Sequence, residues 1–131
     1  MRTILLSIKP EVYDRIFAGN KKYEYRKRIS KESVKAYLYV SKPVQEIKGI
    51  LYLGECCNLT KNDMAEFAEG NKYKMKIWGY QETTSISLEM IKAYDGNFVI
   101  PQGFYYLDNK PIGKYITNTD LAIDVVHKNE F

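Results

Sequence analysis

The residues with the greatest chemical potential in this 131-residue sequence lie in Gly19–Arg28, which combines cations, aromatics and one carboxylate. Successive side chains of a strand point to opposite faces. Read as a strand, the segment places on one face Lys22, Glu24, Arg26 and Arg28, and on the other Tyr23, Tyr25 and Lys27. The tyrosine face is expected to join a core, while the other presents one carboxylate among cations. A polar cleft is one use for such a strand.

Two kinds of chemistry fit these residues. Basic side chains hold phosphates and aromatic rings stack on single-stranded bases. The basic residues that could bind RNA in this way are Lys9, Lys21, Lys22, Arg26, Lys27 and Arg28. Alternatively, Lys21 beside Glu24 in a partly desolvated cleft could supply a general acid, a base or a nucleophile. A purely structural interpretation stays open for both, as an ion pair of Glu24 with Arg26 or as a lysine-protected sheet edge.

The distribution of charge also indicates a polyanionic partner. The net charge is +4, but residues 1–48 hold twelve Lys or Arg against five Asp or Glu, whereas residues 49–131 hold eight against eleven. Such asymmetry suggests that the basic part of the chain faces nucleic acid. The alternative is a set of lysines scattered over a solvated surface.

Several classes of protein lack support in the sequence. It contains no GxSxG, HExxH, P-loop or GxGxxG motif. Cys56 and Cys57 are adjacent, so on a strand they cannot form an ordinary disulfide, and with His127 they are too few for a Cys/His zinc site. We therefore expect no metal and no cofactor. No apolar run approaches the ~18 residues of a membrane span, so we expect no membrane partner and a cytoplasmic location.

The elements that must position the charged segment can be read from periodicity. Thr3–Ile8 is a short, nearly continuous apolar run and predicts a buried strand. Pro10 suits the first turn of a helix, which Gly19 ends in a left-handed conformation. The apolar stripe of that helix consists of Val12, Tyr13, Ile16 and Phe17. Strands are predicted at Val34–Val40 and at Ile47–Cys57, the second bent or bulged at its glycines, Gly49 and Gly54.

The rest of the chain predicts short helices and strands. We expect a helix from Thr60 to about Gly70, a strand within Asn71–Thr84 and a helix from the N-cap Ser87 to about Tyr94. Two strands flank a turn at Pro101–Gly103, Ile112–Ile116 is a last strand or a connection, and the tail is a helix or an edge strand. Tyrosines expected in the core or at an interface are Tyr37, Tyr39, Tyr52, Tyr105 and Tyr106. Residues 1–131 thus form one α+β domain, a small, partly open barrel with inserted helices.

The order of these features resembles the ASCH domain, a branch of the PUA-like superfamily. The resemblance begins with Ser7-Ile-Lys-Pro10 and Ile16, and continues with Gly19-x-Lys21-x-x-Glu24-x-Arg26, which is similar to the family's G-x-K-x-x-E-x-R signature. Weaker elements follow in order: Tyr39-x-Ser41-x-Pro43, Ile47-x-Gly49, and Pro101-Gln-Gly-Phe104, where the family usually has serine in place of the glycine. The match spans roughly residues 3–116, and residues 117–131 are unassigned.

The resemblance implies a PUA-like barrel with a cleft lined by the signature residues and a role in binding RNA or a modified nucleotide. Some relatives are enzymes: one branch hydrolyses N4-acetylcytidine with a lysine, a threonine and a glutamate, and another is reported to cleave RNA. Lys21 matches that lysine, while Glu24 stands where the threonine would be. A protein-interaction module is a third alternative. The ligand-binding residues that we predict are Lys9, Lys21, Glu24, Arg26, Tyr39 and Gln102, with Lys21 and Glu24 as the catalytic pair if the protein is an enzyme.

Overall fold

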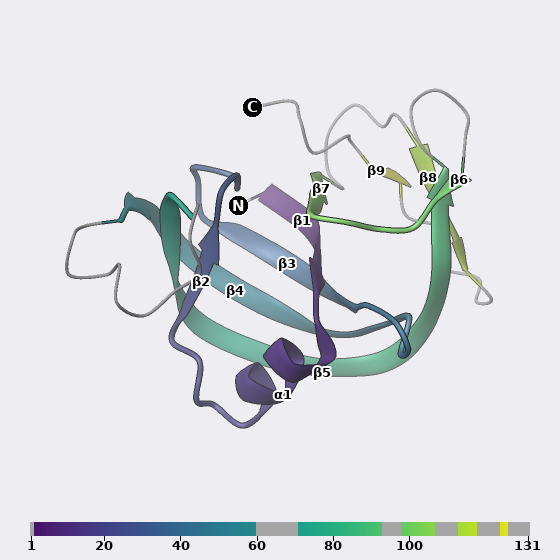
Figure 1. Ribbon diagram of the computed structural model, residues 1–131, viewed down its shortest axis with the longest axis horizontal. Helices are drawn as coiled ribbons and strands as arrows, with labels where there is room; N and C mark the ends of the chain where they lie inside the picture. Colours follow the sequence, from purple (N-terminus) through teal and green to yellow (C-terminus); the bar gives the residue numbers. More distant parts are fainter. Residues whose placement is uncertain (1, 60–70, 93–97, 107–112, 118–123, 126–131) are drawn as a thin grey trace.

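The computed structural model describes residues 2–59, 71–92, 98–106, 113–117 and 124–125. Its elements are β1 (Arg2–Ile8), α1 (Pro10–Phe17), β2 (Tyr23–Arg26), β3 (Val34–Val40), β4 (Glu46–Asn58), β5 (Tyr73–Lys92), β6 (Phe98–Val99), β7 (Phe104–Tyr106), β8 (Gly113–Thr117) and β9 (Asp124–Val125). The strands form one curled sheet, and the long β5 sweeps along its lower side and turns upward to meet β6 and β8 (Figure 1).

The sheet has the order β7-β1-β3-β4-β5-β8-β9, and both β2 and β6 pair with β5. β1 and β3 are parallel, with Ile8 opposite Val40, and every other recorded pairing is antiparallel. The carboxyl ends of β1 and β3 therefore meet at one edge. Because two segments far apart in the sequence end there together, this edge is where a site can form.

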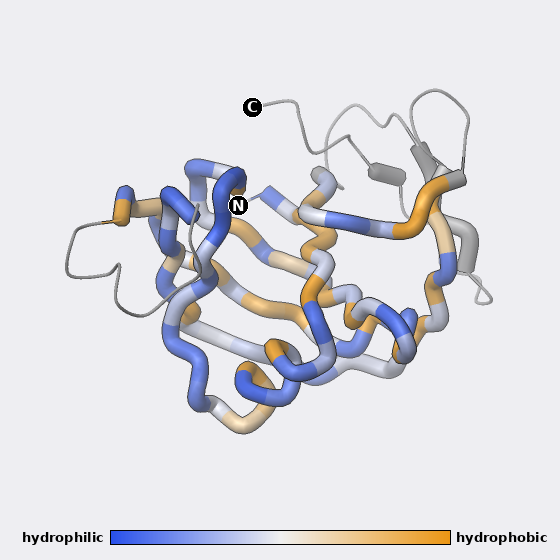
Figure 2. Tube along the Cα trace, in the orientation of Figure 1, coloured by the Kyte–Doolittle hydropathy of each residue, from blue (hydrophilic) through white to orange (hydrophobic). Residues whose placement is uncertain are grey.

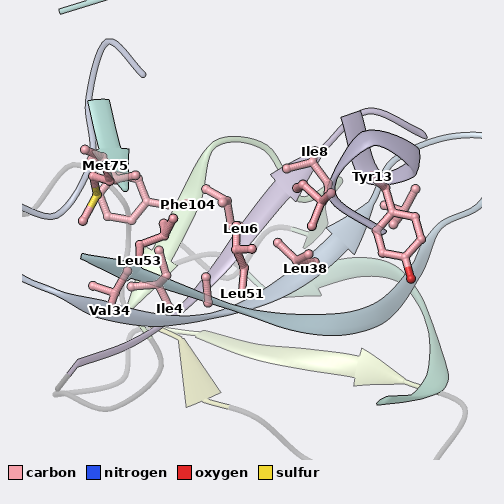
Figure 3. Close-up of a cluster of buried hydrophobic side chains, with 14 residues drawn as sticks. Ile4, Leu6, Ile8, Tyr13, Val34, Leu38, Leu51, Leu53, Met75 and Phe104 are labelled. Carbon is pink, nitrogen blue, oxygen red and sulfur yellow. The ribbon is translucent and has the colours of Figure 1, made fainter. Parts of the chain in front are cut away.

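The main core lies on the face of the sheet that α1 covers, which we call the inner face. Along β3 every second residue belongs to this core, whereas β1 is apolar on both faces. Ile4, Leu6 and Ile8 of β1 pack with that set of β3 beneath the helix (Figures 2 and 3). The buried members of this cluster are Ile4, Leu6, Ile8, Tyr13, Ile16, Ile29, Val34, Ala36, Leu38, Val40, Leu51, Leu53, Met75 and Phe104. The opposite, outer face carries a smaller buried cluster of Leu5, Tyr39, Ile47, Leu88, Ile91 and Tyr105.

The helix α1 is held down by its aromatic residues. Tyr13 and Ile16 are buried as the predicted stripe requires, but Phe17 at the helix end is 56% exposed. The hydroxyl groups of Tyr13 and Tyr80 lie 2.6 Å apart, which ties α1 to β5. Gly49 of β4 leaves room for this contact, because a Cβ there would lie 2.7 Å from Cε2 of Tyr80.

Most of the predicted elements are confirmed, and one is wrong. The first strand, the helix after Pro10, the strands at 34–40 and 47–57 and the irregularity near Gly49 all occur. The helix expected from Ser87 does not, because β5 continues as a strand to Lys92. A register shift between Leu88 and Met90 allows Leu88 and Ile91 to be buried three residues apart, a spacing that resembles that of a helix.

The remaining predictions divide in the same way. The predicted strand at 71–84 belongs to β5, and Ile112–Ile116 overlaps β8. In the tail, β9 pairs with β8, as an edge strand would. The helix predicted at 60–70 lies outside the described residues. No helix among the described residues is long and apolar enough to cross a membrane.

Candidate functional site

A cavity of about 710 Å³ opens where β1 and β3 end, and we call it the inner pocket. Its position follows from the parallel pairing, which brings the residues after Ile8 and after Val40 together; the N–H of Ser41 donates to the carbonyl of Ile8 over 2.9 Å. Strand β2 and the 100–103 segment complete the wall. The lining consists of Ser7, Ile8, Lys9, Val12, Glu24, Tyr25, Arg26, Ser41, Lys42, Asn71, Ile100, Pro101, Gln102 and Gly103.

Glu24 and Arg26 form the fixed charged centre of the inner pocket. Both lie on the same face of β2, and Glu24 pairs with Met75, whose side chain is in the core. Glu24 is therefore only 5% exposed. Arg26 donates from Nε to Glu24 Oε1 over 2.9 Å and from Nη2 to the carbonyl of Ser7 over 2.8 Å. These two bonds orient the guanidinium plane.

The second carboxylate oxygen of Glu24 is less well satisfied. Lys21 Nζ lies 3.9 Å from Oε2, close enough for an ion pair but too far for a hydrogen bond. Oε2 is buried, and no described residue donates a hydrogen bond to it. Burial lowers the pKa of Lys21 below its ordinary value, against the attraction of Glu24 and with further lowering by Arg15 and Arg26. Lys21 is thus a partly desolvated amine beside a buried carboxylate.

Lys21 reaches Glu24 from a turn rather than from the strand. Gly19 follows the helix with a φ of 77°, a left-handed conformation that suits glycine and redirects the chain. A smaller cavity of about 350 Å³ lies here, and we call it the basic side pocket. It is lined by Arg15, Asn20, Lys21, Lys22, Tyr23 and Tyr25. Tyr25 lines both pockets, so β2 separates two basic cavities.

The 100–103 segment closes the far side of the inner pocket. The N–H of Ser7 donates to the carbonyl of Gly103 over 2.8 Å, which fastens the segment to β1. Gly103 adopts a φ of 69°, and the N–H of Gln102 donates to the hydroxyl of Tyr105 over 3.2 Å. Gln102 is exposed, and it lines the pocket opposite β2.

The structure brings together most of the residues that the sequence singled out. Lys9, Glu24, Arg26 and Gln102 line one cavity, and Lys21 contacts Glu24 from the neighbouring one. Tyr39 does not join them, because it is fully buried in the core cluster of the outer face.

The expected orientation of the charged strand is also wrong. Glu24, not the tyrosines, faces the core, while Tyr23 and Tyr25 remain partly exposed on the other face of β2. The carboxylate can be buried because Arg26 and Lys21 accompany it.

The sequence did not identify Ser7, Ser41, Lys42 and Asn71 as residues of the site. The first three follow or end apolar strands, and only the parallel register of β1 and β3 shows that these strand ends meet. Among the described residues, no group of three or more His, Cys, Asp or Glu side chains could hold a metal ion.

Known proteins share this architecture. No family model matches the sequence. A curated protein of Zymomonas mobilis, an ASCH domain-containing ribonuclease, is 24% identical over 134 aligned positions, which cover 88% of this chain and 90% of that protein.

Crystal structures of ASCH from Zymomonas mobilis have the same fold. The chain superposes on one with a TM-score of 0.62 at 23% identity, covering 82% of this chain and 89% of the other. A structure of a variant in which a tyrosine is replaced by phenylalanine gives a TM-score of 0.63 at 21% identity, covering 83% of this chain and 92% of the other. This chain therefore has the fold of these ASCH structures, a curled sheet that forms a small partial barrel, and the resemblance to the ASCH domain seen in its sequence is confirmed.

Proposed function

We propose that this protein binds RNA, or a nucleotide derived from it, in the inner pocket. One observation carries the proposal: Lys9 after β1, Glu24 and Arg26 of β2, and Gln102 of the 100–103 segment come from three separate segments of the chain and line the same cavity. The volume, about 710 Å³, lies in the range of small-molecule sites. The name of the Zymomonas relative, a ribonuclease, supports RNA as the class of ligand.

The charges around the pocket favour an anionic ligand with a polar edge. Lys9 and Lys42 are exposed at the pocket, while the charge of Glu24 is balanced internally by Arg26 and Lys21. In this proposal Lys9 and Lys42 contact phosphate. Arg26 offers its remaining N–H groups to base or phosphate oxygens, and Glu24 holds the guanidinium in place. Gln102 contributes an amide that can donate and accept.

A titration of fluorescently labelled single-stranded RNA by anisotropy at low salt tests this proposal. Arg26→Ala and Lys9→Ala should each weaken binding. Lys9→Ala should also make the plot of log K against log salt less steep, by an amount that corresponds to the loss of about one phosphate contact. Lys48→Ala is the control, since Lys48 lies over the ring of Tyr13 and does not line the pocket. The proposal fails if RNA does not bind at low salt, or if the two pocket variants bind as tightly as the control.

Hydrolysis of RNA or of an acylated cytidine is the second candidate. It is favoured by Lys21, whose burial lowers its pKa and whose Nζ lies 3.9 Å from a carboxylate oxygen without a hydrogen-bond donor among the described residues. Incubation of pure protein with single-stranded RNA and with N4-acetylcytidine separates binding from turnover. Turnover that Lys21→Ala abolishes, with RNA affinity retained, would favour the enzyme; no product with either substrate would exclude it.

We place this function in the cytoplasm as part of the proposal. The described chain contains two cysteines, Cys56 and Cys57, and both are free. Free thiols persist in reducing compartments.

A further inference from the structure

The outer face of the sheet carries a band of aromatic and basic side chains that the inner pocket does not use. Glu24 of β2 and Met75 of β5 are opposite each other and both point to the core, so the residues on either side of them point outward. Across β2, β5, β4 and β3, the outward set comprises Tyr23, Tyr25, Lys74, Lys76, Trp78, Tyr52, Lys35 and Tyr37. We call these residues the outer band.

Trp78 is the most prominent member of the outer band, because it is 56% exposed. The register passes from Tyr52 opposite Gly79 to Leu53 opposite Ile77, so Trp78 is the extra residue of a β-bulge. Bulges re-aim side chains. Here the ring centres of Trp78 and Tyr52 lie 5.0 Å apart, at an interplanar angle of 37°.

Gly79 lets the ring of Tyr52 lie close to the sheet. A Cβ on Gly79 would stand 3.2 Å from the Tyr52 ring, closer than an ordinary contact, whereas a Cβ on Gly54 would stand at an ordinary van der Waals distance of 3.7 Å from Cδ1 of Trp78. Covering glycine with an aromatic ring stabilises sheets, and this accounts for Tyr52. It does not account for an indole that remains more than half exposed to water.

Lysines alternate with the aromatics of the outer band. Lys74 Nζ lies 5.0 Å from the ring centre of Tyr23, and Lys35 Nζ lies 5.5 Å from that of Tyr37. Lys76 is exposed beside Trp78, since both approach the position of a Cβ on Gly54. One exposed carboxylate, Glu55, stands on β4 nearby. The band therefore offers several flat rings with cations between them.

We infer that the outer band is a second binding surface, a stacking platform for single-stranded nucleic acid. Bases that are not paired stack on exposed aromatic rings, and cations between the rings match the phosphates between the bases. A protein partner fits less well, because lysine is depleted in protein interfaces. A duplex fits less well too, because its bases are already stacked. This inference does not require the inner pocket to bind RNA.

The position of β2 also suggests how one nucleic-acid strand can contact both the outer band and the inner pocket. β2 pairs only with β5 among the described residues, so it is an edge. Tyr25 belongs to the outer band and also lines both the inner pocket and the basic side pocket. A single nucleic-acid strand held on the outer band can therefore pass the edge formed by β2, over Arg15 and Lys22, toward the inner pocket.

The single tryptophan provides the test. Trp78 emission is followed while oligouridylate of about twelve nucleotides, or uridine monophosphate, is added at low salt; anisotropy of the labelled oligonucleotide is measured in parallel. We expect the oligonucleotide to quench Trp78 emission and the mononucleotide to leave it unchanged. Trp78→Ala should weaken oligonucleotide binding about tenfold or more, and Trp78→Phe much less, because the ring is kept.

Lys76→Gln and Lys48→Gln form a matched pair that leaves the aromatic rings intact. Lys48 lies over the ring of Tyr13, away from the outer band, so only Lys76→Gln should reduce affinity. Quenching that persists in Arg26→Ala supports the outer band even if the inner pocket does not bind RNA. Oligonucleotide binding with unchanged Trp78 emission and no effect of Trp78→Ala or Lys76→Gln overturns the inference. So does emission that changes only with protein concentration, which would indicate a contact between copies of the chain.

Discussion

The inner pocket and the outer band are built on the two faces of the same short strand, β2, and they differ in how they hold their polar groups. On the inner side Glu24 is 5% exposed, and two hydrogen bonds fix Arg26 against it. On the outer side Tyr23 and Tyr25 are partly exposed, and Lys74 lies over the ring of Tyr23. A fixed guanidinium suits recognition of a particular edge, whereas exposed rings accept any base. Because side chains alternate along the four residues of β2, one face of this strand carries a fixed charged centre and the other carries exposed rings that can stack on any base.

The largest difference between the two surfaces is expected from removal of a carboxylate. Glu24→Ala leaves Arg26 and Lys21 without their buried partner and should lower the free energy of unfolding by about 2–4 kcal/mol. Glu55→Ala removes an exposed carboxylate beside the outer band and should change it by less than about 0.5 kcal/mol. Urea unfolding of both variants measures the two values. Equal effects would mean that Glu24 is not the fixed centre of the inner pocket.

Glycines on the two faces give the next comparison. Alanine at Gly49 would place Cβ 2.7 Å from the Tyr80 ring and 3.0 Å from the carbonyl of Gln81, beneath α1. Gly49→Ala should therefore destabilise the protein by about 1–3 kcal/mol. Gly79→Ala meets the half-exposed Tyr52 at 3.2 Å, where the ring can shift outward, and should destabilise it by less than about 1 kcal/mol.

Thermal unfolding followed by circular dichroism ranks the two glycine variants. A greater loss for Gly79→Ala would show that the outer rings are packed as firmly as the inner ones. That result would contradict the expectation that the exposed rings of the outer band can shift to accept different bases.

The inner pocket and the outer band were not equally predictable from sequence. The signature indicated Lys21, Glu24 and Arg26, because a lone carboxylate among cations is unusual on a strand. The outer band was missed because Trp78 and Tyr52 come together only through the pairing of β4 with β5 and a bulge between them. Alternation within one segment can be read from a sequence, but register between segments cannot.

The helix predicted from Ser87 was wrong for the same reason, because the register of β5 with its neighbours cannot be read from the sequence. Leu88 and Ile91 are buried three residues apart, and Ser87 precedes them, so the local pattern favours a capped helix. The register shift between Leu88 and Met90 produces that spacing within a strand. Burial of Glu24 was missed for a related reason: the pairing with Met75, rather than the polarity of its own segment, decides which face of β2 meets the core.

Tyrosine hydroxyls provide a smaller test of the same contrast. The hydroxyls of Tyr80 and Tyr13 lie 2.6 Å apart, and burial, together with this bond, raises the pKa of Tyr80 well above its ordinary value. Tyr80→Phe should lower the free energy of unfolding by about 1 kcal/mol. Tyr52 donates to Gln81 Oε1 over 3.3 Å at an exposed position, so Tyr52→Phe should have an effect within about 0.5 kcal/mol. Urea unfolding at neutral pH measures both, and a larger loss for Tyr52→Phe would contradict the expected order.

The smallest expected effect is a pH dependence that arises on the inner side of β2. Burial lowers the pKa of Lys21 in the folded protein below its ordinary value of 10.5, so between the two values the unfolded chain binds more protons. The free energy of unfolding of the wild type should therefore rise with pH across this window, relative to Lys21→Met, which lacks the group. Urea unfolding of both proteins at several alkaline pH values gives the difference, and subtraction removes the titration of the tyrosines. If the free energy of unfolding of the wild type minus that of Lys21→Met stays flat or falls with pH, solvent reaches this amine freely. Lys21 would then not share the desolvation that distinguishes Glu24 from the exposed rings of the outer band.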